Sequence, residues 1–290
     1  MKKVVVIGGS GFIGSHVADY LSEAGYQVII YDSNYSPWLS KDQEMVVGDL
    51  LDEKKLNQTI IDAEFVYNFA AIADLNESLL NPQKTININI LGNTNVMESC
   101  RLNNVKRFIF ASTIYVNSRE GGFYRCSKQA SESYVKEYQR VFGLDYTILR
   151  YGSLYGPRSD ESNGIFRIIK SALETGVVKY EGHKESMREY IHVMDAALSS
   201  IEILDDKYNN KSIVLTGYEP MRVIDVLKML AEILGISEDN VEFVEGDYIG
   251  HYVRSPYSYQ SEIVRKLIPP MHIDLGQGML QLINEIEKQN

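Results

Sequence analysis

Three side chains in the middle of the chain, Thr113, Tyr124 and Lys128, have the types and the order of a proton-transfer site. Tyr124 and Lys128 are four residues apart, so on a helix they face the same way. An ammonium group near a phenol favours the phenolate and lowers the tyrosine pKa from about 10 toward neutral pH. We therefore expect Tyr124 to take a proton from a hydroxyl group, and Thr113 to hydrogen-bond the same oxygen. The alternative is that Tyr124 and Lys128 only cover a solvated helix face.

A glycine-rich segment near the N-terminus has the spacing of a phosphate-binding turn. The stretch VVVIGGSGFIGSH places Gly8, Gly11 and Gly14 directly after an expected strand and at the start of an expected helix. Such a turn aims backbone N–H groups at a pyrophosphate. Asp32 ends the next strand, near the spacing of about 20 residues at which an acid binds the ribose hydroxyls and repels a 2′-phosphate. The segment predicts an NAD site that disfavours NADP; the alternative is a structural turn and a surface aspartate.

The elements around these residues alternate between strands and helices. We expect strands at 4–8, 27–32, 44–49, 63–70, 106–112 and 145–151, and helices at 14–24, 82–103 and 124–142. Nearly continuous apolar strands in this order predict a Rossmann-type α/β fold, a doubly wound parallel sheet covered by helices on both faces.

The pattern loosens after about residue 155, where helices are expected at 164–176, 223–235 and 276–288. We therefore divide the chain into an NAD-binding domain, 1–155, and a smaller C-terminal α/β substrate lobe, 156–290. The segment 188–217 is expected to return to the main sheet.

The composition argues against several kinds of partner and several classes of protein. The 290 residues carry a net charge of −10, which argues against nucleic-acid and anionic-membrane partners. The apolar run at 4–7 is too short for a signal peptide, and no stretch approaches the roughly 18 apolar residues of a membrane span. Cys100 and Cys126 make neither a disulfide framework nor a metal set, and the five histidines are scattered. We expect a cytoplasmic protein without a metal.

Several ordered motifs together resemble one family. They are GGSGFIGSH, GDLLD (48–52), FAAIAD (69–74), NILGNTN (89–95), YRCSK (124–128), LRYGSLYGPR (149–158) and REYIHVMDAA (188–197). They are similar to motifs of the extended short-chain dehydrogenases/reductases, the NAD-dependent epimerase/dehydratase family that acts on nucleotide sugars. The resemblance covers nearly the whole chain.

The resemblance implies roles for particular residues. It assigns NAD contacts to Gly8, Gly11, Phe12, Ile13, Gly14, Asp32, Asp49, Leu50, Ala70, Ala71, Asn89, Tyr124, Lys128 and Tyr151. It assigns contacts with a nucleotide-diphosphate sugar to Ser112, Thr113, Ser153, Arg188 and Arg254, with the two arginines on the diphosphate. It also implies a homodimer in which the helices 82–103 and 124–142 pair with their copies as a four-helix bundle.

Two departures from the family pattern bear on the reaction. Dehydratases of the family carry an Asp-Glu pair after the threonine and decarboxylases keep the Glu, whereas this chain has Ile114 and Tyr115. This counts against 4,6-dehydration and decarboxylation, and the run STIY is closer to that of GDP-fucose synthase-like epimerase-reductases. The gap between Thr113 and Tyr124 is also about half of that usual in the family, so we expect the sugar pocket to lack part of its wall.

The sequence therefore predicts an NAD-dependent nucleotide-sugar 4-epimerase that works through a transient 4-keto sugar. Alternatives are a nucleotide-4-keto-sugar reductase that uses external NAD(P)H, a 4,6-dehydratase, and a non-catalytic NAD-binding protein. The nucleotide base and the sugar stay open at this point.

Overall fold

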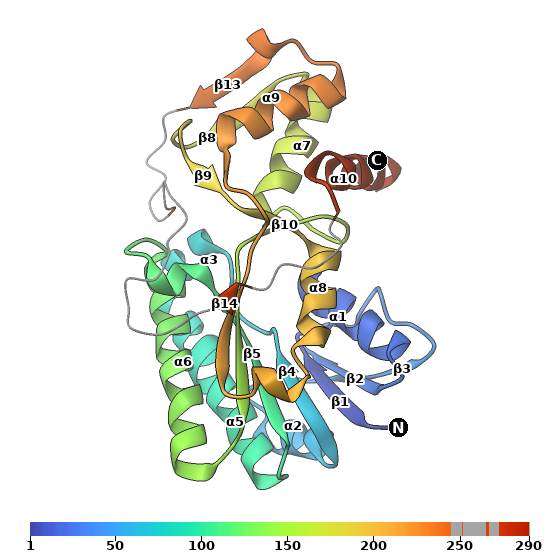
Figure 1. The fold of residues 1–290 in the computed structure, drawn as a ribbon, viewed down its shortest axis with the longest axis vertical. Helices are drawn as coiled ribbons and strands as arrows, with labels where there is room; N and C mark the ends of the chain where they lie inside the picture. The colour runs from blue at the N-terminus through green and yellow to red at the C-terminus, as the bar shows by residue number, and fades with distance from the viewer. Residues whose placement is uncertain (245–250, 252–264, 267–272, 290) are drawn as a thin grey trace.

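One parallel sheet organises the chain, in a computed structural model that describes residues 1–244, 251, 265–266 and 273–289 (Figure 1). The strand order is β14-β11-β6-β5-β4-β1-β2-β3, and neighbouring strands of this sheet pair in parallel. The strands are β1 Lys3–Ile7, β2 Gln27–Asp32, β3 Gln43–Val47, β4 Ala63–Asn68, β5 Arg107–Thr113, β6 Tyr146–Tyr151, β11 Lys211–Leu215 and β14 Arg265–Lys266. The order reverses between β1 and β4, and open α/β sheets bind ligands at such a switch point.

Helices cover both faces of the sheet (Figure 1), and alternating side chains of the strands pack on these two layers. Val4 and Val6 belong to a core shared with α1 (Phe12–Glu23) and α8 (Val193–Glu202). Val5 and Ile7 belong to a core shared with α2 (Glu53–Ile60), α5 (Asn93–Leu102) and α6 (Gly122–Phe142). Because both faces are buried, the strands are apolar nearly throughout. The predicted doubly wound sheet is confirmed.

The helix expected at 82–103 is not regular. It consists of α4 (Pro82–Thr85), a π-helical segment η1 (Ile86–Gly92) and α5. The short helix α3 (Leu75–Leu80) precedes it. Segments of π-helix are rare and often occur at functional sites, and η1 contains Asn89, whose contacts are described below.

The C-terminal elements form a smaller layer above the carboxyl ends of the strands (Figure 1). Its apolar core joins α7 (Gly164–Thr175), α9 (Val223–Leu234) and α10 (Leu275–Gln289). Its strand pairs are β8 (Val178–Glu181) with β13 (Val241–Val244), and β9 (Met187–Arg188) with β12 (Met221–Arg222). The 3₁₀ turn η4 (Glu238–Asn240) precedes β13.

Residues 190–215 connect the C-terminal layer to the main sheet. β10 (Tyr190–His192) pairs with β7 (Ser153–Tyr155), α8 packs beside α1, and β11 lies in the main sheet next to β6. The 3₁₀ turn η3 (Asp206–Tyr208) joins α8 to β11. Of the helices in the described ranges, none is both long enough and apolar enough to cross a membrane.

Candidate active site

The structure brings Thr113, Tyr124 and Lys128 together at the carboxyl end of β5. Thr113 is the last residue of β5, and Tyr124 and Lys128 lie in the first two turns of α6. The side chains of Thr113 and Tyr124 are hydrogen-bonded to each other. The Lys128 ammonium lies 5.9 Å from the centre of the Tyr124 ring. The hydroxyl groups of Thr113 and Tyr124 and the amine of Lys128 thus lie together at the carboxyl end of β5.

The charge states of these groups differ from the sequence expectation. Burial raises the pKa of Tyr124 to about 12, although the hydrogen bond with Thr113 acts to lower it. Burial also lowers the pKa of Lys128 to about 7, opposed by the negative charge of Glu132. Lys128 Nζ donates to the carbonyl oxygen of Ala111 at 2.7 Å. The expected lowering of the Tyr124 pKa is therefore wrong for the protein without ligands, because loss of hydration outweighs the ammonium charge.

A buried ion pair between Glu132 and Arg150 lies next to Lys128. Glu132 lies one turn after Lys128 on α6 and accepts two hydrogen bonds from Arg150 of β6, at 2.9 and 2.6 Å. Ser112 Oγ donates to the same carboxylate at 2.6 Å. Ser112, expected to contact the substrate, is thus bonded inside the fold and is not among the residues that line the cavity described below.

The short segment between Thr113 and Tyr124 places a tyrosine ring beside the catalytic one. The 3₁₀ turn η2 (Ile114–Asn117) carries Tyr115, whose ring meets the Tyr124 ring edge-on at 6.4 Å between centroids. Gly121, at φ +97°, allows this packing, since a Cβ there would lie 2.8 Å from the Tyr115 ring. The Tyr115 hydroxyl lies 2.7 Å from Nδ1 of His251.

Tyr115 and His251 line the cavity over Tyr124. The short gap between Thr113 and Tyr124 predicts that part of the pocket wall is missing here. In the structure, the side chains of Tyr115 and of His251, a residue far along the chain, form wall of the pocket at this place. Burial and the charges of Arg188 and Arg167 lower the pKa of His251 to about 4, while Asp74 acts to raise it. His251 is therefore uncharged at neutral pH.

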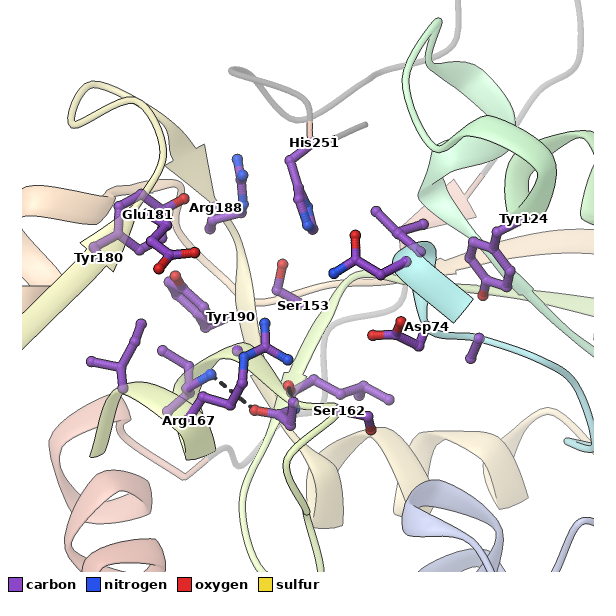
Figure 2. Close-up of a pocket in the computed structure, with 18 of the residues that line it drawn as sticks. Asp74, Tyr124, Ser153, Ser162, Arg167, Tyr180, Glu181, Arg188, Tyr190 and His251 are labelled. Atoms are coloured by element: carbon purple, nitrogen blue, oxygen red, sulfur yellow. Dashed lines mark hydrogen bonds between the residues drawn. The ribbon is translucent and has the colours of Figure 1, made fainter. Parts of the chain in front are cut away.

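A cavity of about 510 Å³ opens between the sheet and the C-terminal layer (Figure 2). Its volume suits a small-molecule ligand. Tyr124, Tyr115 and Asp74 line it from the first layer, and Arg167, Arg188 and Tyr180 are among the residues that line it from the second. Ser153, expected to contact the sugar, lines it as well. Arg254 lies outside the described residues.

Among the cavity residues that the sequence did not predict are Asp74, Arg167 and His251. Asp74 ends the motif FAAIAD, so its position beside a ligand loop was a usable signal. Arg167 interrupts the apolar run of α7, which was a weaker signal. His251 had no local signal, because its contact with Tyr115 spans 136 residues.

The glycine turn leaves one surface open for a ligand. Gly8 has φ +76° and a Cβ there would lie 2.5 Å from the Ala70 nitrogen, and a Cβ on Gly14 would lie 2.2 Å from the Gly8 oxygen. These two glycines are required by the protein's own backbone. Gly11 is exposed, and a Cβ there would meet only the Gly8 oxygen, at 3.4 Å. The absence of a side chain at Gly11 keeps the start of α1, where Phe12 and Ile13 follow, accessible to an incoming group.

This helix start and Asp32 together fit a dinucleotide. No side chain of the described residues caps the N-terminus of α1, so its N–H groups can bind phosphate. Asp32 lies at the end of β2, and its carboxylate accepts from the backbone nitrogens of Ser10 and Asn34, at 3.0 and 3.1 Å. A carboxylate oxygen can accept a further hydrogen bond, so two ribose hydroxyls can still be bound.

The remaining predicted cofactor residues border the same region or support it. Asp49 is exposed after β3, Leu50 packs against Gly92, and Ala70 and Ala71 follow β4 beside the glycine turn. Asn89 bonds the backbone of Ile72 through both amide atoms, at 2.8 and 3.0 Å, and donates to Ser127 Oγ at 2.9 Å. The Tyr151 hydroxyl lies 2.6 Å from Ser200 Oγ. The side chains of Asn89 and Tyr151 thus hold neighbouring segments in place.

Known proteins resemble the chain over its full length. Residues 4–215 match the NAD dependent epimerase/dehydratase family. A Methanocaldococcus jannaschii protein assigned by name to the UDP-glucose 4-epimerases is 29% identical, with 99% of each chain covered. The UDP-glucose 4-epimerase of Thermotoga maritima, solved with UDP-glucose, superimposes with a TM-score of 0.85, 26% identity and 99% of each chain covered. The UDP-glucose 4-epimerase of Thermus thermophilus, solved with NAD, has a TM-score of 0.82 and 25% identity over 98% of this chain and 99% of that one.

Proposed function

Because the chain belongs to the NAD-dependent epimerase/dehydratase family, we propose that it is an NAD-dependent nucleotide-sugar 4-epimerase. The observation that carries the proposal is the arrangement of the cavity. Tyr124, with Thr113 bonded to it from behind the lining, lies on one side, and Arg167 and Arg188 lie on the other. A sugar linked to a diphosphate has the same polarity, with a reactive hydroxyl at one end and two phosphates at the other.

The residues of the chain supply proton transfer and orientation. Tyr124 takes the proton of the C4 hydroxyl and gives it back, and Thr113 holds the same oxygen. When bound, NAD supplies the acceptor and then the donor of the C4 hydride. The turn around Gly11, the carboxylate of Asp32 and the amine of Lys128 would hold it. Between the two hydride transfers the 4-keto sugar must turn over in the cavity.

Ile114 and Tyr115 support an epimerase over a dehydratase. Neither side chain is a carboxylate, and Tyr115 contacts Tyr124 and His251. A base that removes the proton next to the C4 carbonyl, as dehydration needs, has no carboxylate at these positions. The substrate that the relatives favour is a UDP-sugar, with Arg188 on the diphosphate and Ser153 near the sugar. A diphosphate role for Arg254 stays a prediction.

We also propose the domain division and the homodimer. Residues 1–155, together with much of 188–217 and with β14, form the cofactor layer, and the other described residues form the substrate layer. Apolar side chains are exposed along η1 and α6, among them Ile86, Leu91, Phe123, Tyr134 and Val141. Val96 and Met97 of α5 are fully buried in the core. The exposed apolar side chains of η1 and α6 support a homodimer that forms through these helices. The cytoplasmic location of the protein stays a prediction.

The test is incubation of the purified protein with a panel of UDP-sugars, followed by NMR and mass spectrometry, with absorbance recorded at 340 nm. An epimerase gives a product of unchanged mass, inverted at C4, with no lasting change in absorbance. Stoichiometric consumption of NADH or NADPH would identify the reductase. A product lighter by one water would identify the dehydratase.

A further inference from the structure

Charge is distributed unequally over the cavity. Its lining cations, Arg167, Lys179 and Arg188, come from α7, β8 and β9 in the C-terminal layer. The side that carries Tyr124 offers a carboxylate instead, that of Asp74 (Figure 2). Tyr115, whose ring meets that of Tyr124, adds a hydroxyl group there. Among the described residues that line the cavity, every Lys and Arg therefore belongs to the substrate layer.

Asp74 is fixed in place by the start of α3. It is the N-cap of that helix, and its Oδ1 accepts from the Glu77 nitrogen at 2.7 Å. No residue of the described chain hydrogen-bonds its other oxygen, Oδ2, and the side chain is half-buried. Figure 2 shows the carboxylate on the same side of the cavity as Tyr124. One oxygen thus holds the helix, and the other can accept a hydrogen bond from a ligand.

Three other polar groups of the cavity, those of His251, Tyr115 and Ser153, carry no charge that could offset that of Asp74. Asp74 is close enough to act on His251 electrostatically, but the pKa of His251, lowered to about 4, leaves that ring uncharged at neutral pH. Tyr115 and Ser153 contribute hydroxyl groups. A hydroxyl of a bound sugar can donate to Asp74, whereas a second carboxylate in the same partly buried place would be repelled.

We propose that Asp74 determines the class of sugar: the site takes nucleotide sugars that present hydrogen-bond donors there and rejects uronic acids. This inference rests on the proposed function, since it assumes that the diphosphate lies on the side of Arg167 and Arg188. The accepted class has no carboxylate at C6, and it includes neutral hexoses and sugars with an amino group.

Asp74→Asn is the informative variant. Asparagine has nearly the same size and keeps an oxygen that can cap α3, so the change removes the charge and little else. Glu181→Gln is the matched control, because Glu181 also lines the cavity but lies on β8, in the layer of the cations. Thermal unfolding of each variant reports whether the fold is retained.

The measurement is calorimetric binding of UDP, UDP-glucose and UDP-glucuronate to NAD-saturated protein carrying Tyr124→Phe, which slows turnover during the titration. We expect UDP-glucose to bind at least tenfold more tightly than UDP-glucuronate, a difference of about 1.4 kcal/mol. Asp74→Asn should reduce the preference to about threefold or less, and Glu181→Gln should leave it unchanged.

Equal binding of the two sugars by protein with Asp74 intact would overturn the inference while leaving the epimerase proposal in place. A preference that survives Asp74→Asn would overturn it as well. If UDP itself fails to bind, the assignment of the cavity to a nucleotide sugar fails, and the inference fails with it.

Discussion

The ammonium group of Lys128 donates to the carbonyl oxygen of Ala111 across 2.7 Å, inside a shell that leaves the side chain almost inaccessible to water. Ala111 lies on β5, two residues before Thr113, so this bond ties the catalytic helix to the catalytic strand. The same burial lowers the pKa of Lys128 to about 7. Small changes around this amine therefore alter its charge near neutral pH.

Replacement of Glu132 is expected to move the pH dependence of the reaction. The cationic form of Lys128 is present below its pKa and is lost as the pH rises through it. Glu132 raises that pKa, so Glu132→Gln should shift the alkaline loss of kcat/KM to lower pH, by about one unit. The Arg150 charge left behind acts in the same direction.

Ser112→Ala is the control for this shift. It removes the hydrogen bond to Glu132 but keeps the carboxylate charge, so its pH profile should match that of the unmodified protein. A Glu132→Gln profile that falls in rate at every pH without moving along the pH axis would show that the ion pair is only structural.

Loss of the Tyr124 hydroxyl should separate binding from chemistry. Tyr124→Phe should leave NAD affinity near normal but lower kcat by roughly a hundredfold or more, the usual scale for a general acid–base. Lys128→Ala should lower both the affinity for NAD and kcat. Steady-state kinetics and NAD titration of the two variants provide the measurement, and near-normal turnover by Tyr124→Phe would place the active site elsewhere.

Asp32 should select NAD over NADP. Its carboxylate is held by Ser10 and Asn34 beside the glycine turn, where a 2′-phosphate would meet a like charge. Titration calorimetry should give at least tenfold tighter binding of NAD, or about 1.4 kcal/mol. Asp32→Asn should reduce the ratio of NAD affinity to NADP affinity. Equal affinities of the unmodified protein for NAD and NADP would refute the role of Asp32 in cofactor choice.

A charge placed on the exposed apolar face of α6 should disrupt the proposed dimer. Tyr134 is 49% exposed on this helix, so Tyr134→Glu should convert a dimer to a monomer at micromolar concentration by light scattering. Tyr218→Glu is the control, because Tyr218 is 61% exposed but lies outside these helices. A monomeric unmodified protein would remove the basis for the dimer.

The parts of the structure that follow local patterns were predictable from the sequence. The strands β1 to β6 and the glycine turn could be located because burial on both faces makes strands apolar, and because backbone contacts require glycine at Gly8 and Gly14. The contact between Tyr115 and His251 could not be located in this way, since it joins distant segments. The pKa of Tyr124 was predicted in the wrong direction, because it depends on burial that no spacing rule contains.

The central claim is that the hydride removed from C4 returns to the same carbon. The direct test uses the UDP-sugar identified by the panel, labelled with deuterium at C4, and incubated with the protein in the presence of unlabelled NADH. The account predicts that the recovered epimer keeps its deuterium at C4 and that the NADH is not consumed. An epimer with protium at C4, formed together with an equal amount of deuterated NADH, would contradict it.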